Sequence, residues 1–402
     1  MMAPFSSPHR ILALDVLRGI AVIGIVGMNV HAFALPGPAY YNPLSFGGTT
    51  PADYWVWLVS FVFIEDKFRT LFAMLFGVGC LILLEKGGER PWRAHFARMF
   101  VLLVIGIVHA TLLASNDVLR AYALTGLAVP LLAGLSARAL VTVAAGLVVA
   151  HLALGLTALG GALVDFHAKH WGTDALLWAE RQFGRDPAVL TMLLEQGREG
   201  LGERIIRRGA GIPAQLLTVA ASLPINLAAI ALGMGLWKGG MLKGEWRAFL
   251  LQRLAGGAAL AAIPALLGLA GWLVAEGFPA ALVGPVALVL SAPFDTLLGV
   301  GYAALTMAFV SRETVVSRTL AAVGRLSLTN YLMTSAILAV IFAPWGLGLF
   351  GEVTRWQAFA LGLVPIAAML AWSPLWVAKL GQGPFERLWR AGAKLLSYTK
   401  VR

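Results

Sequence analysis

The segment Leu14–Phe33, LDVLRGIAVIGIVGMNVHAF, decides the fold class of this chain. Most of its residues are Leu, Ile, Val, Gly and Ala, and its length is what a helix needs to cross a hydrocarbon core of about 30 Å. It also carries Asp15, Arg18, Asn29 and His31. Polar side chains in a membrane helix are costly and face the bundle interior or a wet cavity. The segment therefore predicts a first membrane span with a functional side.

The composition extends this interpretation to the whole chain. Of the 402 residues, 59% are hydrophobic and only 13% are charged, whereas soluble domains carry about 25% charged residues. We expect an all-α polytopic membrane protein that forms a single membrane domain, 1–402, with about ten transmembrane helices. The apolar stretches that are long enough to span lie at 14–35, 67–85, 98–114, 119–135, 139–160, 214–237, 250–275, 284–310, 320–344 and 357–377.

Two further segments are expected at the membrane surface. The first is the stretch DYWVWLVSFVFIEDKF (53–68). A single helix formed by this stretch and the next span would be too long for one crossing, so we expect an interfacial or re-entrant helix. The segment 161–213 joins the two halves of the chain, and its later part is amphipathic, with Leu193, Leu201 and Ile205 able to share one face. We expect it to be extracytoplasmic and to lie on the membrane, with a lid over an active site as the alternative.

The basic residues are distributed unevenly along the chain. With the amino terminus in the cytoplasm, the cytoplasmic segments hold 19 Lys and Arg and the short segments on the other side hold 4. This asymmetry predicts that both termini are cytoplasmic. The net charge of +11 is then explained by topology and by attraction to anionic lipid. Nucleic acid is not an expected partner.

Three polar residues of the first span line up on one helical face. Asp15 and Arg18 are three residues apart and can pair, and Asn29 returns to that face after about three turns. His31 lies on a different face. In one interpretation, the pair is structural and Asn29 bonds a neighbouring helix. In the other, the stripe lines a substrate tunnel that is entered from the cytoplasm.

Several motifs resemble those of known membrane families. The stretch RILALDVLRGIAVIGIVGMNVHAF resembles the first-span signature of a superfamily of transmembrane acyltransferases, whose members include lysosomal heparan-glucosaminide N-acetyltransferase and bacterial glucan succinyltransferases. Later motifs resemble, in order, the bacterial YeiB-like family (domain of unknown function 418). These motifs are FIEDKFRTLFAMLFGVG, GIVHATLLASNDVLRAYALTGL, VGRLSLTNYLMTSAI, GLGLFG and GPFERLWR. Members of that family commonly have Gly where Asp66 stands, and they read GPLEWLWR where this chain has Arg387.

The third and fourth spans supply the candidate catalytic groups. His109 is predicted near the outer end of the third span and Asp117 in the turn that follows. A histidine oriented by a carboxylate can act as a general base on a hydroxyl group. In the alternative, Asp117 caps the next helix and His109 only packs between helices. His31 is a second candidate base, and we prefer His109 because the family-like motif surrounds it.

The candidate substrate-binding residues combine arginines with hydrogen-bonding groups. Arg18 and Arg325 are predicted near the cytoplasmic side, where their planar guanidinium groups could bind the phosphates of an acyl-CoA. Asn330 and Tyr331 could polarise a thioester carbonyl, as could Asn29, or could simply hydrogen-bond between helices. The remaining candidates for substrate binding are Asp15 and Lys67.

These observations lead to one expected function and two alternatives. The first is a transmembrane acyltransferase that moves an acyl group from a cytoplasmic thioester to a cell-envelope acceptor. The second is a secondary transporter, proton-coupled through Asp295 or His151, with Pro293 as a broken-helix signal. The third is a lipid-handling or scaffold protein without turnover.

The expected ligands follow from the first function. The donor would be acyl-CoA, for example acetyl-CoA, and no metal is expected because Cys80 is the only cysteine and no ligand cluster is visible. The expected partners are membrane lipids and, as an open alternative, a second copy of the chain in a homodimer.

Overall fold

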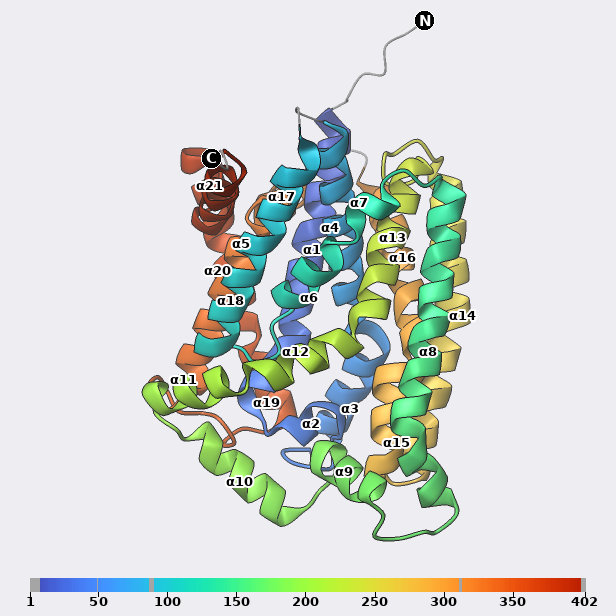
Figure 1. Ribbon diagram of the computed structural model, residues 1–402, viewed down its shortest axis with the longest axis vertical. Helices are drawn as coiled ribbons and strands as arrows, with labels where there is room; N and C mark the ends of the chain where they lie inside the picture. Colours follow the sequence, from blue (N-terminus) through green and yellow to red (C-terminus); the bar gives the residue numbers. More distant parts are fainter. Residues whose placement is uncertain (1–7, 49, 87–89, 311–312, 399–402) are drawn as a thin grey trace, which may run out of the picture.

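The protein folds into a bundle of long helices that run between two ends, as Figure 1 shows. The structure is a computed structural model that describes residues 8–48, 50–86, 90–310 and 313–398. Within these ranges the chain forms helices and connecting loops, and no β-strand is present. The predicted all-α fold is therefore confirmed.

Seven described helices are long and apolar enough to cross a membrane, or up to nine if each of two bent pairs forms one span. The seven are α1 (Pro8–Ala34), the run from α3 (Pro51–Val59) to α4 (Lys67–Glu85), α5 (Pro91–Leu112), α8 (Ala137–His167), α14 (Ala248–Ala275), α16 (Ala292–Phe309) and the run from α19 (Arg355–Leu361) to α20 (Leu363–Leu380). The bent pairs are α12 (Ile212–Ala221) with α13 (Leu223–Lys238), at 53°, and α17 (Val315–Arg325) with α18 (Ser327–Phe342), at 82°. The chain is a multi-pass membrane protein.

One of the ten predicted spans is not a long helix. The stretch 119–135 forms two short helices, α6 (Leu119–Gly126) and α7 (Val129–Leu132). Pro130 lacks the amide hydrogen that would continue α6, so the helix stops before it. Nearly every residue of α6 is buried, including Arg120 and Tyr122. The helix α6 is therefore an interior element, and the stretch 119–135 is not one of the long helices.

The stretch predicted as a separate interfacial or re-entrant helix instead leads into α4 in one interrupted crossing. After α3 come the π-helix η1 (Ser60–Ile64), then Glu65 and Asp66, and then α4. Asp66 has a φ of 58°, a left-handed conformation that glycine adopts freely and aspartate tolerates better than most residues. The family resemblance implies glycine at this position, and the conformation gives the reason.

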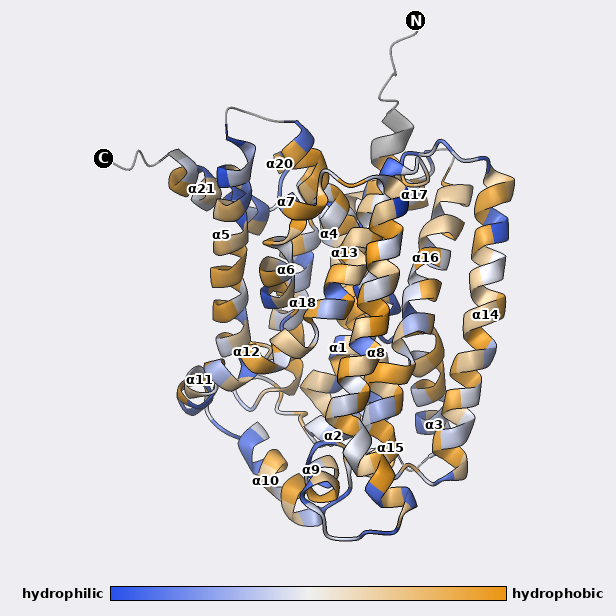
Figure 2. Cartoon of the chain, turned by 45° about the vertical axis from the view of Figure 1, so that its right-hand side comes forward, coloured by the Kyte–Doolittle hydropathy of each residue, from blue (hydrophilic) through white to orange (hydrophobic). Residues whose placement is uncertain are grey.

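The two ends of the bundle hold different elements. The end at which α1 begins also carries the α7–α8 connection, the α13–α14 connection and α21 (Pro384–Tyr398), as Figure 1 shows. The far end carries α2 (Gly37–Tyr41), α9 (Asp174–Phe183), α10 (Pro187–Gly197) and α11 (Leu201–Ala210). Hydrophobic residues cover the long helices between them, and hydrophilic residues gather toward the ends (Figure 2). The α7–α8 connection, the α13–α14 connection and α21, which the Lys and Arg count predicts on one side, do share one end. Lys67 and Arg120, counted on the other side, are instead buried inside the bundle. The compartment that each end faces stays a prediction.

Close packing of α1 against α17 brings the polar face of the first span next to the break between α17 and α18. A Cβ atom on Gly324 would overlap the carbonyl group of Asp15, and one on Gly19 would overlap that of Leu320. Small residues of this kind allow membrane helices to touch backbone to backbone. The contact places Arg325, at the end of α17, beside the polar stripe of α1.

Candidate functional site

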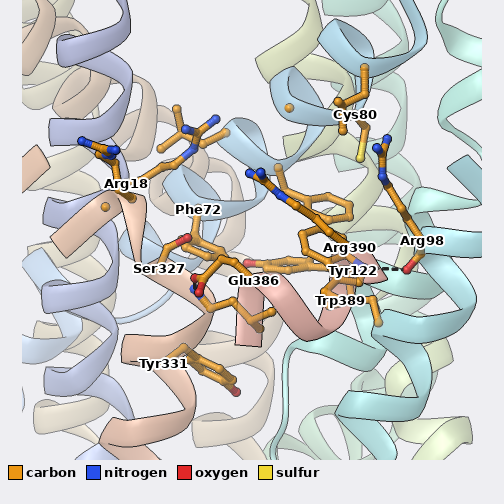
Figure 3. A pocket seen from close by; sticks show the side chains of 18 of the residues that line it. Arg18, Phe72, Cys80, Arg98, Tyr122, Ser327, Tyr331, Glu386, Trp389 and Arg390 are labelled. Carbon is orange, nitrogen blue, oxygen red and sulfur yellow. Dashed lines mark hydrogen bonds between the residues drawn. The ribbon is translucent and has the colours of Figure 1, made fainter. Parts of the chain in front are cut away.

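A large cavity lies in the half of the bundle nearest the start of α1. We call it the inner cavity; it has a volume of about 640 Å³ and is lined by α1, α4, α5, α18 and α21 among other elements. Figure 3 shows Arg18 and Arg98 on opposite sides of this cavity, with Arg390 between them and Tyr331 at its lower edge. The fourth arginine of the lining is Arg325.

Two carboxylates in the inner cavity are already engaged. Asp15 accepts a hydrogen bond from Arg18 at 2.8 Å, so the predicted pair is confirmed. Glu386 accepts hydrogen bonds from the backbone amides of Leu328 and Thr329 at 2.9 and 3.1 Å, at the start of α18. Four arginines and two carboxylates leave a net charge of +2 on the lining. A cavity of this charge suits a ligand rich in phosphate, because guanidinium groups bind phosphate through paired hydrogen bonds.

The two predicted catalytic residues meet deep in the bundle. His109 Nδ1 and Asp117 Oδ1 lie 2.8 Å apart, and both side chains are buried. With the carboxylate accepting from Nδ1, the neutral ring carries its lone pair on Nε2. His109 Nε2 is buried and has no hydrogen-bond partner among the described residues. The pair thus has the form of a general base whose working nitrogen is unoccupied.

Neighbouring groups fix the carboxylate of this pair. Asp117 Oδ2 accepts from the backbone amide of Arg120 at 3.0 Å, and the Arg120 Nε lies 3.7 Å away. The Tyr331 hydroxyl donates to Asp117 Oδ1 at 3.3 Å and accepts from the Val118 amide at 3.3 Å. A Cβ on Gly106 would lie 2.8 Å from Asp117 Oδ2, so this position in α5 must stay small. Asp117 thus accepts from an amide in the first turn of α6, as the alternative interpretation expected, although the N-cap residue of this helix is Val118.

Tyr331 lies between the inner cavity and a second cavity. The second one, which we call the central cavity, has a volume of about 310 Å³ and is lined by Asn29, Glu65, Asp66 and Tyr331 among others. Tyr331 lines the inner cavity too, and its ring lies 5.2 Å from that of His109 between centroids. The polar stripe of α1 therefore borders two cavities in succession: Asp15 and Arg18 line the inner one, and Asn29 lines the central one.

The structure places the other predicted residues away from this site. Lys67 is buried at the start of α4, where its Nζ lies 2.6 Å from Asp295 Oδ1 and donates to the carbonyl of Phe61. Asn330 donates to the Val323 carbonyl and accepts from Trp372, so it joins α17, α18 and α20.

The second candidate base also lies outside the network around Asp117. His31 is buried near the far end of α1 and stacks on Phe359 with 6.2 Å between ring centroids. The charged group that acts on His31 is the Arg355 guanidinium. The structure thus brings His109, and not His31, together with Asp117.

Several lining residues were not singled out from the sequence. Arg98 and Arg390 counted only toward the topology, and Glu386 was only part of the GPFERLWR motif. That motif was the signal that could have drawn attention to Glu386 and Arg390. The role of Gly106 had no separate signal beyond its place three residues before His109.

Comparison with known proteins identifies the family. The family described as "Protein of unknown function (DUF418)" matches residues 236–395. The chain is 32% identical to the uncharacterized protein YeiB of Escherichia coli (strain K12), over 95% of this chain and 96% of that relative. It is 26% identical to the uncharacterized protein YxaH of Bacillus subtilis (strain 168), over 98% of this chain and 96% of that relative. No solved structure matches. The chain belongs to the YeiB-like DUF418 family.

Proposed function

We propose that this protein is an acyltransferase of the bacterial inner membrane that passes an acyl group from cytoplasmic acyl-CoA to a cell-envelope acceptor. The observation that carries the proposal is the buried His109–Asp117 pair, whose Nε2 has no partner among the described residues and whose ring lies against Tyr331. Tyr331 in turn borders one cavity on each side. A base at the boundary between two cavities suits a reaction whose two substrates arrive from opposite sides of a membrane.

The inner cavity supports the donor half of this proposal. Acyl-CoA carries three phosphate groups, and the four arginines of the inner cavity give them cationic partners. Arg18 and Arg325 keep the donor-binding role predicted for them, and Arg98 and Arg390 join them. The end of the bundle with the inner cavity is also the end rich in Lys and Arg, which faces the cytoplasm under the positive-inside rule.

The chemistry requires one proton transfer and one acyl transfer. His109 Nε2 would remove the proton from an acceptor hydroxyl as the oxygen attacks the thioester carbonyl. A C–O bond forms, the C–S bond breaks, and the CoA thiolate takes the proton from His109. Asp117 would hold the ring in the required tautomer and stabilise its charged form. The Asn29 amide, on the central-cavity side, is our candidate for a donor to the carbonyl oxygen.

Because the ring of Tyr331 lies against His109, the proposal requires this side chain to move. Rotation of Tyr331 would join the inner and central cavities and open a path to Nε2. Its two hydrogen bonds are long, at 3.3 Å each, so they oppose such a rotation only weakly.

The direct test is acyl transfer by the purified protein in lipid nanodiscs. We expect acetyl-CoA labelled in the acetyl group to release CoA only when bacterial envelope extract is added, with label appearing in an envelope component. Arg18→Gln combined with Arg325→Gln should raise the KM for acetyl-CoA by about tenfold or more, because each guanidinium–phosphate contact contributes about 1.5–3 kcal/mol. Arg138→Gln, which removes an exposed arginine at the same end, is the matched control. Absence of both CoA release and acetyl-CoA binding would refute the proposal.

A second candidate function is secondary transport, and the interrupted helices favour it. The Lys67–Asp295 pair joins two crossings at their breaks, since Lys67 begins α4 and Asp295 lies in the first turn of α16. Transporters commonly bind substrate and ions at discontinuous helices. His151, the other group named for proton coupling, bonds the carbonyl of Leu288 in the π-helix η2 (Val286–Leu290) at 2.9 Å. Uptake of a metabolite into proteoliposomes in response to a pH gradient, lost in Asp295→Asn, would favour this function.

A further inference from the structure

A third cavity at the far end of the bundle contains basic groups that the proposed reaction does not use. We call it the outer cavity; it has a volume of about 520 Å³ and lies among the ends of α1, α5 and α18 and the helices α10, α11 and α12. Its lining includes Arg204, Arg207 and Arg208, all from α11, and no acidic side chain of the described residues lines it. A cluster of cations without a facing carboxylate indicates a site for an anion.

The three arginines differ in how far their charges are neutralised. Arg207 is paired, because its Nε lies 2.9 and 2.8 Å from the two carboxylate oxygens of Glu199. Arg204 donates through Nη2 to the carbonyl of Gly197, but its buried Nε has no hydrogen-bond partner among the described residues. Arg208 makes one long hydrogen bond, of 3.5 Å, to the carbonyl of Ala110. Two half-buried guanidinium groups are therefore left without a carboxylate partner in the described structure.

Electrostatics supports this interpretation. Burial, followed by repulsion from Arg204 and Arg207, lowers the pKa of Arg208 to about 10. Burial first and repulsion from Arg207 second also lower the pKa of Arg204. Both pKa shifts mean that the folded structure destabilises the charged forms of Arg204 and Arg208. A bound anion would relieve that destabilisation, because it would supply the missing opposite charge.

The outer cavity is connected to the His109 network. Gln215 accepts from Arg120 Nη1 at 2.7 Å and donates to the backbone carbonyl of Arg208 at 3.1 Å. Arg120 in turn bonds Asp117 through its backbone amide. The outer and central cavities also share part of their lining, including Ser115 and Asn116. A ligand whose anionic group lies at α11 could therefore extend toward the central cavity.

The surroundings favour an amphiphilic ligand. Apolar side chains make up much of the rest of the lining, and they include Phe33, Leu193 and Phe350. Ile206, which lies on the side of α11 opposite Arg204 and Arg208, is 74% exposed. An apolar side chain turned outward in this way is typical of a helix that lies on a membrane. Lipid headgroups would be within reach of such a helix.

We propose that the outer cavity binds a phosphate ester through Arg204 and Arg208, and that this phosphate compound is the acyl acceptor. The identification as acceptor rests on the proposed function, whereas the binding of phosphate does not. Two sources share this chemistry: the headgroup of an anionic phospholipid and a soluble glycerol phosphate. The second would reach the cavity from water and the first from the membrane.

The test measures binding to the full-length protein in phosphatidylcholine nanodiscs without acyl-CoA, by microscale thermophoresis. The probes are dihexanoyl phosphatidylglycerol, sn-glycerol 3-phosphate and glycerol. We expect at least one of the two phosphate esters to bind and glycerol not to bind. Binding of the lipid alone identifies the headgroup as the source, binding of glycerol phosphate alone identifies the soluble ester, and equal binding identifies the phosphate group itself.

Variants locate the site. Arg204→Gln combined with Arg208→Gln should weaken phosphate binding at least tenfold, because a charged hydrogen bond contributes about 1.5–3 kcal/mol. Arg204→Lys combined with Arg208→Lys keeps the charges and should retain most of the affinity. Arg181→Gln, which removes an exposed arginine of α9, should change nothing. If neither ester binds, or if the glutamine variant binds as the wild type does, the proposal is wrong.

Two further measurements keep the result interpretable. If the glutamine variant does not elute as a folded protein, displacement of the bound ester from the wild type by inorganic phosphate, and not by equal ionic strength of chloride, tests the site instead. Failure of displacement by phosphate would count against it. Because no acyl-CoA is present, loss of phosphate binding and loss of acyl transfer are separate outcomes: the first refutes the anion site, and the second refutes the acyltransferase.

Discussion

Two buried acid–base pairs of this bundle differ in which of their polar atoms lack a partner. His109 and Asp117 pair at 2.8 Å, Lys67 and Asp295 pair at 2.6 Å, and all four side chains are almost fully buried. The lysine is engaged by Asp295 and the carbonyl of Phe61. The histidine keeps Nε2 without a partner among the described residues, and its ring lies against Tyr331, which lines two cavities. Burial of charge alone therefore does not distinguish a catalytic group from a structural one. For that reason, the catalytic role that we propose for His109 rests on its unpartnered Nε2 and on its contact with Tyr331.

The largest expected effect separates these two pairs directly. His109→Ala should lower the rate of CoA release about 10²- to 10⁴-fold, which is the usual contribution of a general base. Folding should survive, since Asp117 keeps its hydrogen bonds to the Arg120 amide and the Tyr331 hydroxyl. Size-exclusion elution and the rate of acetyl transfer would be measured together. His167→Ala, at the exposed end of α8, is the control. Full activity of His109→Ala would remove the proposed base.

The second prediction concerns stability. Lys67→Met should destabilise the folded protein by about 3–5 kcal/mol, because it leaves the Asp295 carboxylate buried without its cation. Lys67→Met combined with Asp295→Asn should recover much of this loss. The double-mutant cycle would be measured by thermal or denaturant unfolding in detergent. Normal stability of Lys67→Met would mean that the two groups are not a structural pair, and would strengthen the transport alternative.

The third prediction targets the contact that holds Asp117 in place. Gly106→Ala adds a Cβ 2.8 Å from Asp117 Oδ2 and 2.9 Å from the Arg120 amide nitrogen. Overpacking of this kind costs about 1–3 kcal/mol, and here it should displace the carboxylate from His109. We expect activity to fall more than stability does. Gly134→Ala is the matched control, because a Cβ there would meet nothing within 4 Å. If Gly106→Ala and Gly134→Ala have the same activity, the exact placement of the Asp117 carboxylate is not important for the reaction.

The smallest expected effect belongs to Tyr331→Phe. This change removes the hydroxyl that bonds Asp117 and the Val118 amide while the ring stays in place. A net loss of about 0.5–1.5 kcal/mol is expected for such hydrogen bonds, hence at most a roughly tenfold change in kcat. A larger loss would make the hydroxyl part of the chemistry. A gain in kcat would instead indicate that the hydroxyl restrains a gate between the inner and central cavities.

The sequence predicted the candidate site only in part. The family-like motif directed attention to His109 and Asp117, and their contact, at 2.8 Å, was not visible in the sequence. Arg18 and Arg325 were identified because a charged side chain in or beside an apolar span stands out. Arg204 and Arg208 were not identified, because arginines in an amphipathic surface helix are ordinary, and only the fold shows that they line a cavity.

The sequence by itself determined the membrane class, the all-α fold and the uneven distribution of Lys and Arg between the two ends. These properties depend on hydrophobicity and charge summed along short segments of the chain. They can therefore be predicted without knowing which residues contact one another in the folded protein. Tertiary structure alone decided that α6 lies in the interior, that Lys67 pairs with Asp295, and that Tyr331 lies between two cavities. Each of these depends on how helices distant in the chain pack together, and that packing sets which polar atoms find partners and which stay free.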